Sequence, residues 1–378
     1  MSVYVDVSAA VHAKAGLSRY ATNLVHALVP LLGDQLALFQ NSLGKCGPLD
    51  GLADVPVSGT SLGYRPWRAA VLAAQALHLS SARLAPGARV FHATEHLLPP
   101  VKAPTVMTVH DLIFELYPHY HRLPNYVYLK AAMPLYCRRA GRIIAVSQAT
   151  RHDLLERYGL AEDKIVVVPE AAAPHFAPAT PEEIERVRIK FNLHGRYIVA
   201  VGTLEPRKNI ANLALACGPL FQRGLAEMLV VVGARGWLFE DAMRQISSLP
   251  WSNRVLMPGY VTDQDLVALY SGAMLTVQPS YYEGFGLPVL EAMACGSPVC
   301  ASNTSSLPEV GGDAAEYFDP QRIESMVGTL ERVADDDELR AQMRCRGLER
   351  AKAYSWEATA RQTVAVYQQL APEIVLYA

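Results

Sequence analysis

The chain has 378 residues, of which 34 are Lys or Arg and 36 are Asp or Glu, and its formal net charge at pH 7 is −2. A nearly balanced charge with 51% apolar residues is typical of a globular protein and gives no bias toward nucleic acid or anionic lipid. No segment approaches the ~18 consecutive apolar residues of a membrane span, and the N-terminus lacks the pattern of a signal peptide. We therefore expect a cytoplasmic protein, with peripheral contact at the inner face of the membrane left open. The six cysteines lie far apart and are expected to be reduced, buried thiols: Cys46, Cys137, Cys217, Cys295, Cys300 and Cys345.

Short apolar strands alternate with longer segments of helical period in the first half of the chain. The expected strands are Ser2–Val7, Ala37–Phe39, Val90–His92, Val106–His110, Ile143–Val146 and Ile165–Val168. The expected helices are Arg19–Leu32, Trp67–Leu84, Pro124–Ala140 and Ala149–Tyr158. This alternation predicts a parallel sheet with helices on both faces.

A Pro- and Ala-rich stretch, Pro169–Pro178, breaks both periodicities and is the expected linker. A charged helix, Pro181–Lys190, follows it, and the alternation then restarts. The expected strands are Tyr197–Val201, Met228–Val232, Arg254–Met257, Ala273–Gln278, Pro298–Ala301 and Ala315–Phe318. The expected helices are Asn209–Ala216, Phe239–Ser247, Asp263–Ser271, Leu287–Cys295, a short one near Ser306–Val310, and two closing helices.

The pattern predicts an α/β protein of two doubly wound, parallel-sheet domains. We expect an N-terminal, acceptor-side domain over residues 1–172 and a C-terminal donor domain over residues 173–360. The last helix, about residues 361–378, is expected to pack back on the N-terminal domain. Ligands of such sheets bind at the carboxyl ends of the strands, so the residues after each strand are the candidates for a site.

Two adjacent cations, Arg207 and Lys208, follow the strand Tyr197–Val201 and precede the next predicted helix. Cations at the start of a helix are unfavourable unless an anion binds there. Arg207 can donate two hydrogen bonds to phosphate oxygens, and Lys208 supplies a compact charge. The segment indicates a phosphate site, and Gly202 within it is expected to line that site.

The segment after the strand Ala273–Gln278 contains Glu283 in a glycine-rich loop and Glu291 one turn into the following helix. Both carboxylates can face one site, with the backbone N–H groups of Phe285, Gly286 and Leu287 between them. Carboxylates beside helix-start N–H groups can bind hydroxyls and phosphate together. By contrast, the first strand is not followed by the Gly-x-Gly-x-x-Gly fingerprint of nicotinamide-dependent dehydrogenases.

These segments resemble glycosyltransferase family 4, a large group of GT-B-fold, mostly retaining, metal-independent sugar transferases. In that fold, two Rossmann-like domains face each other across a cleft. The resemblance spans nearly the whole chain and is most specific over Val199–Ile210, Pro258–Val261, Gln278–Pro320 and Tyr354–Trp356. In the first half it is carried by Gly16, Phe91-His92 and Thr108–Asp111. The chain departs from the family in having one glycine at Gly16 where two are common, and Pro169–Ala172 where an Asn-Gly pair is common.

The resemblance implies a role for each donor-side residue of the second half. Glu291 would accept hydrogen bonds from the two ribose hydroxyls of the nucleotide, and Glu283 would contact the donor hexose near O3. Arg207 and Lys208 would neutralise the diphosphate and stabilise the leaving nucleotide. Fixed positive charge is what a sugar transfer without a metal requires, because negative charge develops on the leaving group.

The resemblance also implies further contacts with the donor. Gly16 would offer its N–H to the phosphates, and His110 would touch the hexose near O6. The main chain near Tyr260 and Val261 would contact the base. No metal is expected, since the sequence shows no Asp-x-Asp motif of the kind that holds a divalent cation on the phosphates. The run Asp335-Asp336-Asp337 is expected to be a solvated part of a helix near the C-terminus, and no other cofactor is implied.

The function implied is a retaining hexosyltransferase that acts on a glycan or a lipid-diphosphate-linked acceptor. GDP-mannose is favoured as the donor because Val106–Asp111 and the loop at Tyr117-Pro118 resemble bacterial mannosyltransferases of surface polysaccharide. The alternatives are a UDP-glucose-dependent transferase, a non-catalytic module that binds a nucleotide sugar, and a GT-B phosphorylase or epimerase. His119 and His121 are candidates for the acceptor side.

Overall fold

The structure is a computed structural model that describes residues 2–12, 15–41, 49 and 51–377. The chain forms two compact units, each described here by itself. Unit 1 comprises Met1–Pro118, Leu123–Glu170 and Ser355–Ala378. Unit 2 comprises His119–Arg122 and Ala171–Tyr354. The sequence placed the boundary at Glu170 two residues later, after residue 172, and the return to unit 1 near residue 361.

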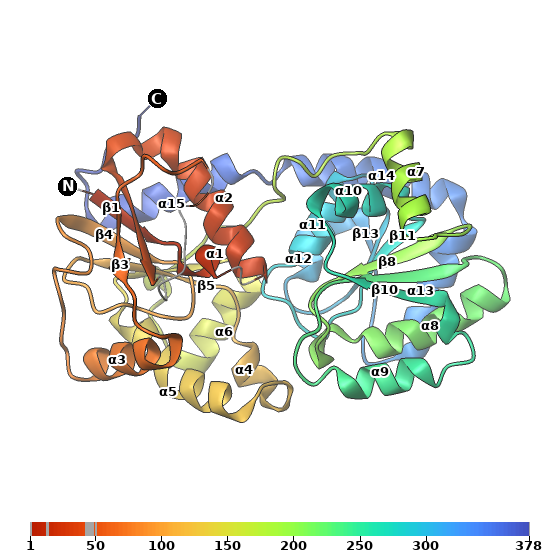
Figure 1. Cartoon of the computed structure of the whole chain (residues 1–378), viewed down its shortest axis with the longest axis horizontal. Coiled ribbons are helices and arrows are strands. Elements are labelled where there is room, and N and C mark those ends of the chain that lie inside the picture. The colour runs from red at the N-terminus through yellow and green to blue at the C-terminus, as the bar shows by residue number, and fades with distance from the viewer. Residues whose placement is uncertain (1, 13–14, 42–48, 50, 378) are drawn as a thin grey trace. The chain divides into compact units, whose positions relative to one another are not determined.

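Unit 1 is built on a parallel sheet that, within the described residues, has seven strands in the order β3-β2-β1-β4-β5-β6-β7 (Figure 1). The strands are β1 (Ser2–Asp6), β2 (Leu36–Asn41), β3 (Val57–Thr60), β4 (Ala88–Ala93), β5 (Thr105–Val109), β6 (Arg142–Ala145) and β7 (Ile165–Val167). Most residues of the inner strands are buried because helices cover both faces of the sheet.

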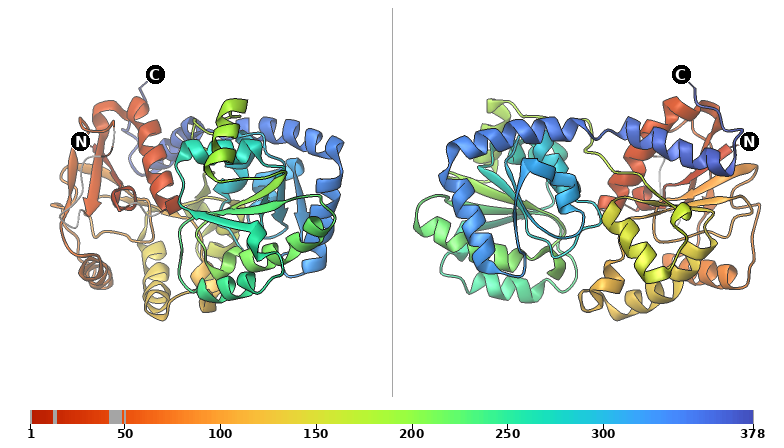
Figure 2. Two further views of the ribbon diagram at one scale, coloured as in Figure 1. Left: turned by 45° about the vertical axis from the view of Figure 1, so that its right-hand side comes forward. Right: turned by 180° about the vertical axis from the view of Figure 1, so that it is seen from behind.

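One face of this sheet is covered by α3, α5 and α6, whose apolar side chains share a buried core with the strands. The C-terminal helix α15 lies beside α2 (Figure 2). The helices of unit 1 are α1 (Ser8–Val11), α2 (Ala15–Leu32), α3 (Tyr64–Ala76), α4 (Ile113–Leu116), α5 (Leu123–Arg139), α6 (Gln148–Tyr158) and α15 (Trp356–Leu370). Residues that follow unit 2 in the sequence therefore complete unit 1.

Unit 2 repeats the same architecture with a parallel sheet that, in the part of the chain described, has six strands in the order β10-β9-β8-β11-β12-β13. The strands are β8 (Tyr197–Val201), β9 (Met228–Val232), β10 (Val255–Gly259), β11 (Leu275–Gln278), β12 (Val299–Ser302) and β13 (Ala315–Phe318). The helices are α7 (Pro181–Lys190), α8 (Ile210–Gln222), α9 (Glu240–Ser247), α10 (Asp263–Gly272), α11 (Leu287–Ala294), α12 (Leu307–Gly311), α13 (Ile323–Asp335) and α14 (Asp337–Lys352). Both sheets are doubly wound, as the sequence predicted.

Side-chain caps fix where several of these helices begin. Ser147, Thr262 and Ser355 each accept a hydrogen bond from the backbone N–H three residues later, at the starts of α6, α10 and α15. Thr180 does the same for α7 and forms a reciprocal capping box with Glu183. These are the short polar side chains that satisfy otherwise unbonded first-turn N–H groups.

Two expectations in the first half were wrong. The helix expected at Trp67–Leu84 is α3, which begins at Tyr64 and ends at Ala76. It ends there because His78 adopts a left-handed backbone conformation (φ 57°) and the N–H of Leu79 turns back to the carbonyl of Ala74. The edge strand β3 was not predicted, since only one of its four residues, Val57, is a large apolar residue.

Two other expectations concern the burial of the cysteines and membrane-spanning helices. Cys137, Cys217, Cys295 and Cys300 are buried free thiols as expected, but Cys345 is exposed on α14, and Cys46 lies outside the described residues. Within the described residues, no helix is long and apolar enough to cross a membrane.

The topology defines one position in each unit where a ligand is expected. The strand order reverses between β1 and β4 in unit 1 and between β8 and β11 in unit 2. Loops that leave two such strands run in opposite directions and open a crevice at their carboxyl ends. In unit 2 these loops begin at Gly202 and Pro279, and both contain residues that the sequence predicted for the donor site.

Gly233, directly after β9, provides a test of this edge of the sheet. A Cβ at Gly233 would lie 2.0 Å from the carbonyl oxygen of Gly202, and the residue has φ 151°. We expect Gly233→Ala to destabilise unit 2 by about 2–4 kcal/mol, because strain and overpacking each cost roughly 1–3 kcal/mol. Urea unfolding followed by tryptophan fluorescence would measure the loss.

Gly224→Ala is the matched control. Gly224 also has a positive φ (68°), but a Cβ there would meet nothing within 4 Å. We expect a loss of roughly 1 kcal/mol from the backbone conformation alone. Equal losses for the two variants would show that the close approach of Gly233 to Gly202 does not affect the free energy of unfolding.

Candidate active site

The segment after β8 places Arg207 and Lys208 before the next helix, as the sequence predicted. They lie in a short 3-10 turn, Pro206–Lys208, and α8 begins only after it, at Ile210. Asn209 separates the two elements with a left-handed conformation (φ 57°). The predicted helix start at Asn209 is thus wrong by one residue, and the two cations precede the helix.

Gly202 makes room for the side chain of Lys208. A Cβ at Gly202 would lie 3.0 Å from Cε of Lys208, and Gly202 has φ 153°. Lys208 itself is 7% exposed, so its stem packs against the backbone at the end of β8. The glycine at this position therefore allows a lysine to be buried beside the sheet.

The carboxylate of Glu283 binds both cations. Lys208 Nζ lies 2.6 Å from Oε1 of Glu283, and Arg207 Nη1 lies 2.8 Å from Oε2. Gln278 and Ser280 also donate to Oε1, at 2.7 and 2.5 Å. These contacts join the loops after β8 and β11 at the place where the strand order reverses.

Arg207 is held by a second carboxylate as well. Its Nη2 lies 2.7 Å from Oε1 of Glu205, while its Nη1 donates to the carbonyl of Tyr282 at 3.0 Å. The side chain of Arg207 is 17% exposed and that of Lys208 is 9% exposed. Arg207 is therefore the more accessible cation, and the neighbouring groups fix its planar guanidinium.

Glu205, Arg207, Lys208 and Glu283 form one ion cluster. Electrostatics favour its ionised form. Burial by itself would raise the pKa of Glu283, but the charges of Arg207 and Lys208 outweigh it and hold that pKa well below its ordinary value. Burial and the nearby charge of Arg207 lower the pKa of Lys208. Glu283 thus remains a carboxylate that neutralises part of the positive charge, in addition to the hexose contact expected from sequence.

The loop from Glu283 to Gly286 is anchored by two serines of the segment before α12. Ser306 donates to the carbonyls of Glu283 and Phe285 at 2.9 and 2.6 Å, and Ser305 accepts from the N–H of Glu283 at 2.9 Å. Gly286 has φ 110°, and a Cβ there would come within 2.8 Å of Leu307. This conformation begins α11, whose first-turn N–H groups have no acceptor within the helix.

Glu291 lies on α11 one turn after its start and is 4% exposed. Tyr270 of α10 donates to Oε2 of Glu291 at 3.3 Å. Tyr260 and Val261 directly follow β10. The side chain of Tyr260 is exposed (78%), whereas that of Val261 is buried (7% exposed). A ligand-facing main chain is compatible with a buried Val261 side chain.

In unit 1, Gly16 lies inside the first turn of α2, which begins at Ala15 and not at Arg19 as the sequence pattern suggested. Among the described residues, a Cβ at Gly16 would meet nothing within 4 Å. The N–H of Gly16 belongs to the first turn of an 18-residue helix, where N–H groups are directed out of the helix.

His110 follows β5 and is 8% exposed. Its Nδ1 lies 2.9 Å from Oε1 of Glu170, and its Nε2 lies 3.0 Å from the carbonyl oxygen of Thr94. A contact of His110 with the donor hexose was expected from the sequence; in the structure both ring nitrogens lie within hydrogen-bond distance of protein acceptors. Glu170 was noted only as a departure from the family pattern and was not expected to bind His110.

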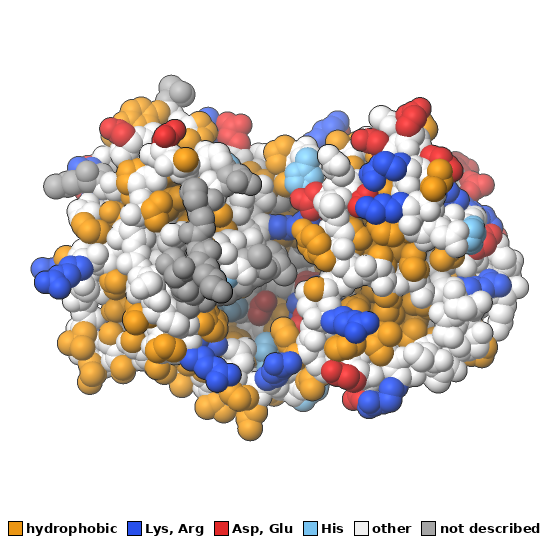
Figure 3. Space-filling view, in the orientation of Figure 1, with side chains coloured by type: hydrophobic (Ala, Val, Ile, Leu, Met, Phe, Trp, Pro, Cys, Tyr) orange, Lys and Arg blue, Asp and Glu red, His pale blue; other side chains and the backbone are white. Residues whose placement is uncertain are grey.

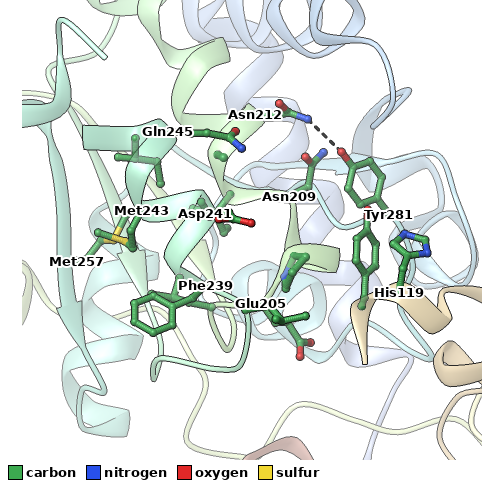
Figure 4. Close-up of a pocket in the computed structure, with 18 residues that line it drawn as sticks. His119, Glu205, Asn209, Asn212, Phe239, Asp241, Met243, Gln245, Met257 and Tyr281 are labelled. Carbon is green, nitrogen blue, oxygen red and sulfur yellow. Dashed lines mark hydrogen bonds between the residues drawn. The ribbon is translucent and has the colours of Figure 1, made fainter. Parts of the chain in front are cut away.

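Unit 2 also has a cavity of about 470 Å³ beside the ion cluster (Figure 4). Glu205 lines it and also binds Arg207. Apolar side chains of α9 and β10 form one wall, and Tyr120 stacks on Tyr281 at another, with ring centroids 6.0 Å apart. His119, an acceptor-side candidate from the sequence, is in the lining, whereas His121 is not.

Two basic segments of unit 1, residues 64–68 and 137–142, make contacts within that unit. The guanidinium of Arg68 lies 3.7 Å from the ring centroid of Tyr128 and donates to Asn125. Arg142 donates to Gln369 of α15. Basic and acidic side chains are interspersed on the face shown in Figure 3. In the described ranges no group of three or more His, Cys, Asp or Glu side chains is placed to hold a metal ion.

Comparisons with known proteins identify the family of the chain. Residues 181–350 match the family model "Glycosyl transferases group 1", and residues 15–174 match "Glycosyltransferase Family 4". O-antigen chain mannosyltransferase B of Escherichia coli is 34% identical over 283 residues, which are 74% of each chain. The chain belongs to glycosyltransferase family 4. The serotype-specific mannosyltransferase WbdA of Escherichia coli is 30% identical over 272 residues, but these are only 33% of WbdA.

Solved structures share the fold over nearly the whole chain. Sucrose-phosphate synthase from Thermosynechococcus elongatus has a TM-score of 0.76 at 21% identity, covering 98% of this chain and 99% of that one. HepE of Anabaena, solved with UDP and glucose, has a TM-score of 0.73 at 19% identity, covering 97% and 99%. At these identities the likeness shows the fold alone, which is the GT-B fold predicted from the sequence.

The ion cluster leads to a prediction about stability. Glu283→Gln removes the negative charge that faces buried Lys208, so we expect a loss of about 3–5 kcal/mol in urea unfolding. The wild-type contribution is complete above the unfolded pKa of about 4.3 and is lost as pH falls below it, because folding lowers the pKa of Glu283. The variant should therefore lose less stability than the wild type on acidification.

Glu316→Gln is the control, since Glu316 pairs with Arg332 at 2.6 Å on the surface of the same unit. A surface pair contributes under about 1 kcal/mol. A Glu283→Gln variant as stable as Glu316→Gln would mean that the cluster does not hold the two loops together.

Proposed function

We propose that this chain is a retaining mannosyltransferase that moves mannose from GDP-mannose to a glycan or lipid-linked acceptor of polysaccharide synthesis. The observation that carries the proposal is the 34% identity to O-antigen chain mannosyltransferase B over 74% of both chains. The charge cluster at the strand-order reversal of unit 2 supports a diphosphate donor. A lipid-diphosphate acceptor would bring the enzyme to the inner face of the membrane from the cytoplasm.

The donor would bind mainly to unit 2. Arg207 is assigned to the diphosphate because its guanidinium is fixed by Glu205 and Glu283 while still 17% exposed. Lys208, more deeply buried, would act through its charge. The N–H groups of Phe285, Gly286 and Leu287 would bind phosphate at the start of α11.

The remaining donor contacts are assigned to the ribose, the base and the phosphates. Glu291 would accept hydrogen bonds from the ribose hydroxyls in place of Tyr270. The main chain at Tyr260 and Val261 would contact the base. Gly16 would offer its N–H to the phosphates at the start of α2. No metal ion or other cofactor is required by this assignment.

The bond between the sugar C1 and the phosphate oxygen breaks in the transfer, and its electron pair goes to the diphosphate. The acceptor hydroxyl oxygen forms the new bond to C1 from the same face and passes its proton to the leaving phosphate oxygen. Positive charge fixed before the reaction stabilises the charge that develops on the leaving group without reorganisation. Glu283 contributes by holding Arg207 and Lys208 in place, because four side chains converge on its carboxylate.

Nucleotide preference is tested by thermal shift with GDP, UDP and ADP and their common sugar conjugates, with and without Mg²⁺. A ligand at ~100 times its dissociation constant stabilises the fold by roughly 2.7 kcal/mol, which is readily measured. We expect GDP and GDP-mannose to raise the melting temperature with and without Mg²⁺. A response to UDP compounds alone would replace the donor with a UDP-sugar. Binding of GDP-mannose without release of GDP, in the presence of acceptor-containing cell envelope, would indicate a non-catalytic module.

The roles of Glu291 and Arg207 are separable. We expect Glu291→Ala to weaken GDP binding with a smaller effect on turnover, because the ribose contacts are the same before and during the reaction. Arg207→Ala should lower kcat by about 10²–10³, since the charge it stabilises develops only in the transition state. Titration calorimetry with GDP and a GDP-release assay measure the two effects. Equal losses of affinity with unchanged turnover in both variants would contradict this division.

A further inference from the structure

The cavity of unit 2 is built from residues that the donor assignment leaves unused. It is lined mainly by α8, α9 and the segment that leads into α8, together with Met257 of β10. In the described part of unit 2, none of the residues assigned to the donor lines it. Glu205 joins the two places, because it lines the cavity and binds Arg207. The cavity is therefore a candidate site for a second ligand beside the donor.

One wall of the cavity is aromatic and includes residues from the first half of the chain. The four residues His119–Arg122 belong to unit 2. Trp237 anchors them, because its Nε1 donates to the carbonyl of Tyr120 at 2.5 Å and its ring lies 5.8 Å from that of His121. The rings of Tyr120 and Tyr281 are stacked at an interplanar angle of 22°. Both tyrosines line the cavity and are half-buried.

Another wall is apolar and contains a strained residue. Leu238 has φ 56° and is 47% exposed, although a left-handed backbone is unfavourable for a residue with a side chain. Phe239, Met243 and Met257 line the cavity beside it and are only half-buried. Figure 4 shows these three on the side of the view opposite Tyr281. Strain and exposed apolar side chains around a concave site are typical of ligand binding.

Carboxamide side chains supply much of the polar lining. Asn209, Asn212 and Gln245 line the cavity, and each carboxamide has both donor and acceptor groups. Nδ2 of Asn212 donates to the hydroxyl of Tyr281 at 3.0 Å (Figure 4). Nδ2 of Asn209 donates to the carbonyl of Pro320 at 3.0 Å. These bonds fix the orientation of two amides at the cavity.

The charge of the lining favours a neutral ligand over a phosphate. Glu205 and Asp241 line the cavity, whereas no Lys or Arg is among its described lining residues. A neutral sugar suits such a site, because its hydroxyls can donate to carboxylates and amides. The apolar C–H face of a sugar ring can pack on the electron-rich face of a tyrosine. The volume of about 470 Å³ lies within the roughly 300–1,000 Å³ of small-ligand sites.

We propose that this cavity is a subsite for a neutral hexose unit of the glycan acceptor. The sugar ring packs on the aromatic wall at Tyr281, and its hydroxyls bond to the carboxamides of Asn212 and Gln245. This inference rests on the proposed function and narrows its acceptor to one that already carries a neutral sugar. The diphosphate of a lipid-linked acceptor is not held in this cavity. Because Glu205 also binds Arg207, the subsite shares one carboxylate with the ion cluster.

The first test is an NMR titration of the ¹⁵N-labelled whole chain with α-linked mannobiose, and with maltose and lactose as other neutral disaccharides. The side-chain amide signal of Asn212, identified by its loss in Asn212→Leu, reports on the cavity. We expect mannobiose at millimolar concentration to shift this signal both without GDP and at saturating GDP. A shift that GDP abolishes would assign the cavity to the donor and overturn the proposal. No shift with any of the three sugars would also overturn it.

Two substitutions block the subsite in different ways. Asn212→Leu replaces the amide by an apolar side chain of similar size, and Ala242→Phe fills the cavity from α9. We expect each to weaken mannobiose binding, measured by saturation-transfer NMR, by about tenfold or more. The affinity for GDP, measured by calorimetry, should stay within about twofold of wild type. Unchanged mannobiose binding in both variants would place the sugar elsewhere and overturn the proposal.

Asn253→Leu is the matched control, since Asn253 is an exposed asparagine of the same unit that does not line the cavity. It should bind mannobiose and GDP as the wild type does, and a loss equal to that of Asn212→Leu would contradict the assignment. Melting temperatures check the folding of each variant, and Asn212→Leu decides by itself if Ala242→Phe unfolds. If GDP-mannose neither binds nor releases GDP, the proposed function fails, and the mannobiose titration still decides whether the cavity binds a sugar.

Discussion

The structure of the candidate site depends on the burial of two positive charges at the end of one strand. Lys208 is 7% exposed, and a lysine so deeply buried requires a carboxylate in contact with it. Glu283 provides that carboxylate from the neighbouring strand end, and Gly202 provides the space. The path of both loops and the start of α11 follow from this one requirement, because each must bring its residue to the same point at the edge of the sheet.

The sequence predicted the fold well because its signals are local. Apolar strands that are buried on both faces can be found without knowledge of their partners, and the strand that became β8, Tyr197–Val201, has the predicted ends. Backbone conformation was harder. Asn209 and His78 take left-handed conformations that redirect the chain, and neither is a glycine that would signal the turn. The strand β3 lacks an apolar pattern because it lies at the edge of the sheet.

The candidate site was predicted as a set of residues but not as a set of contacts. Glu283 and Arg207 are 76 positions apart in sequence, and nothing in either segment indicates that they form an ion pair. The same holds for His110 and Glu170, which are 60 positions apart. In both units a carboxylate meets a basic side chain where loops leave parallel strands, and that recurrence follows from the topology, which gathers distant loops at one edge. Polar residues at the end of an apolar strand, such as Gln278 and Ser280, were the available signal for the contacts that were missed.

The return of the chain to unit 1 has a consequence for how the protein is made. Unit 1 lacks α15 until the residues that follow Tyr354 have been synthesised, and α15 supplies Tyr367 to His92, Trp356 to the ring of Tyr20 and Thr359 to Pro169. The long segment of unit 2, Ala171–Tyr354, leaves the ribosome before that helix does. Domains generally fold as units during synthesis. Unit 1 therefore has an incomplete core at a time when unit 2 can already fold. We expect unit 2 to complete its fold before unit 1, although most of unit 1 is synthesised first.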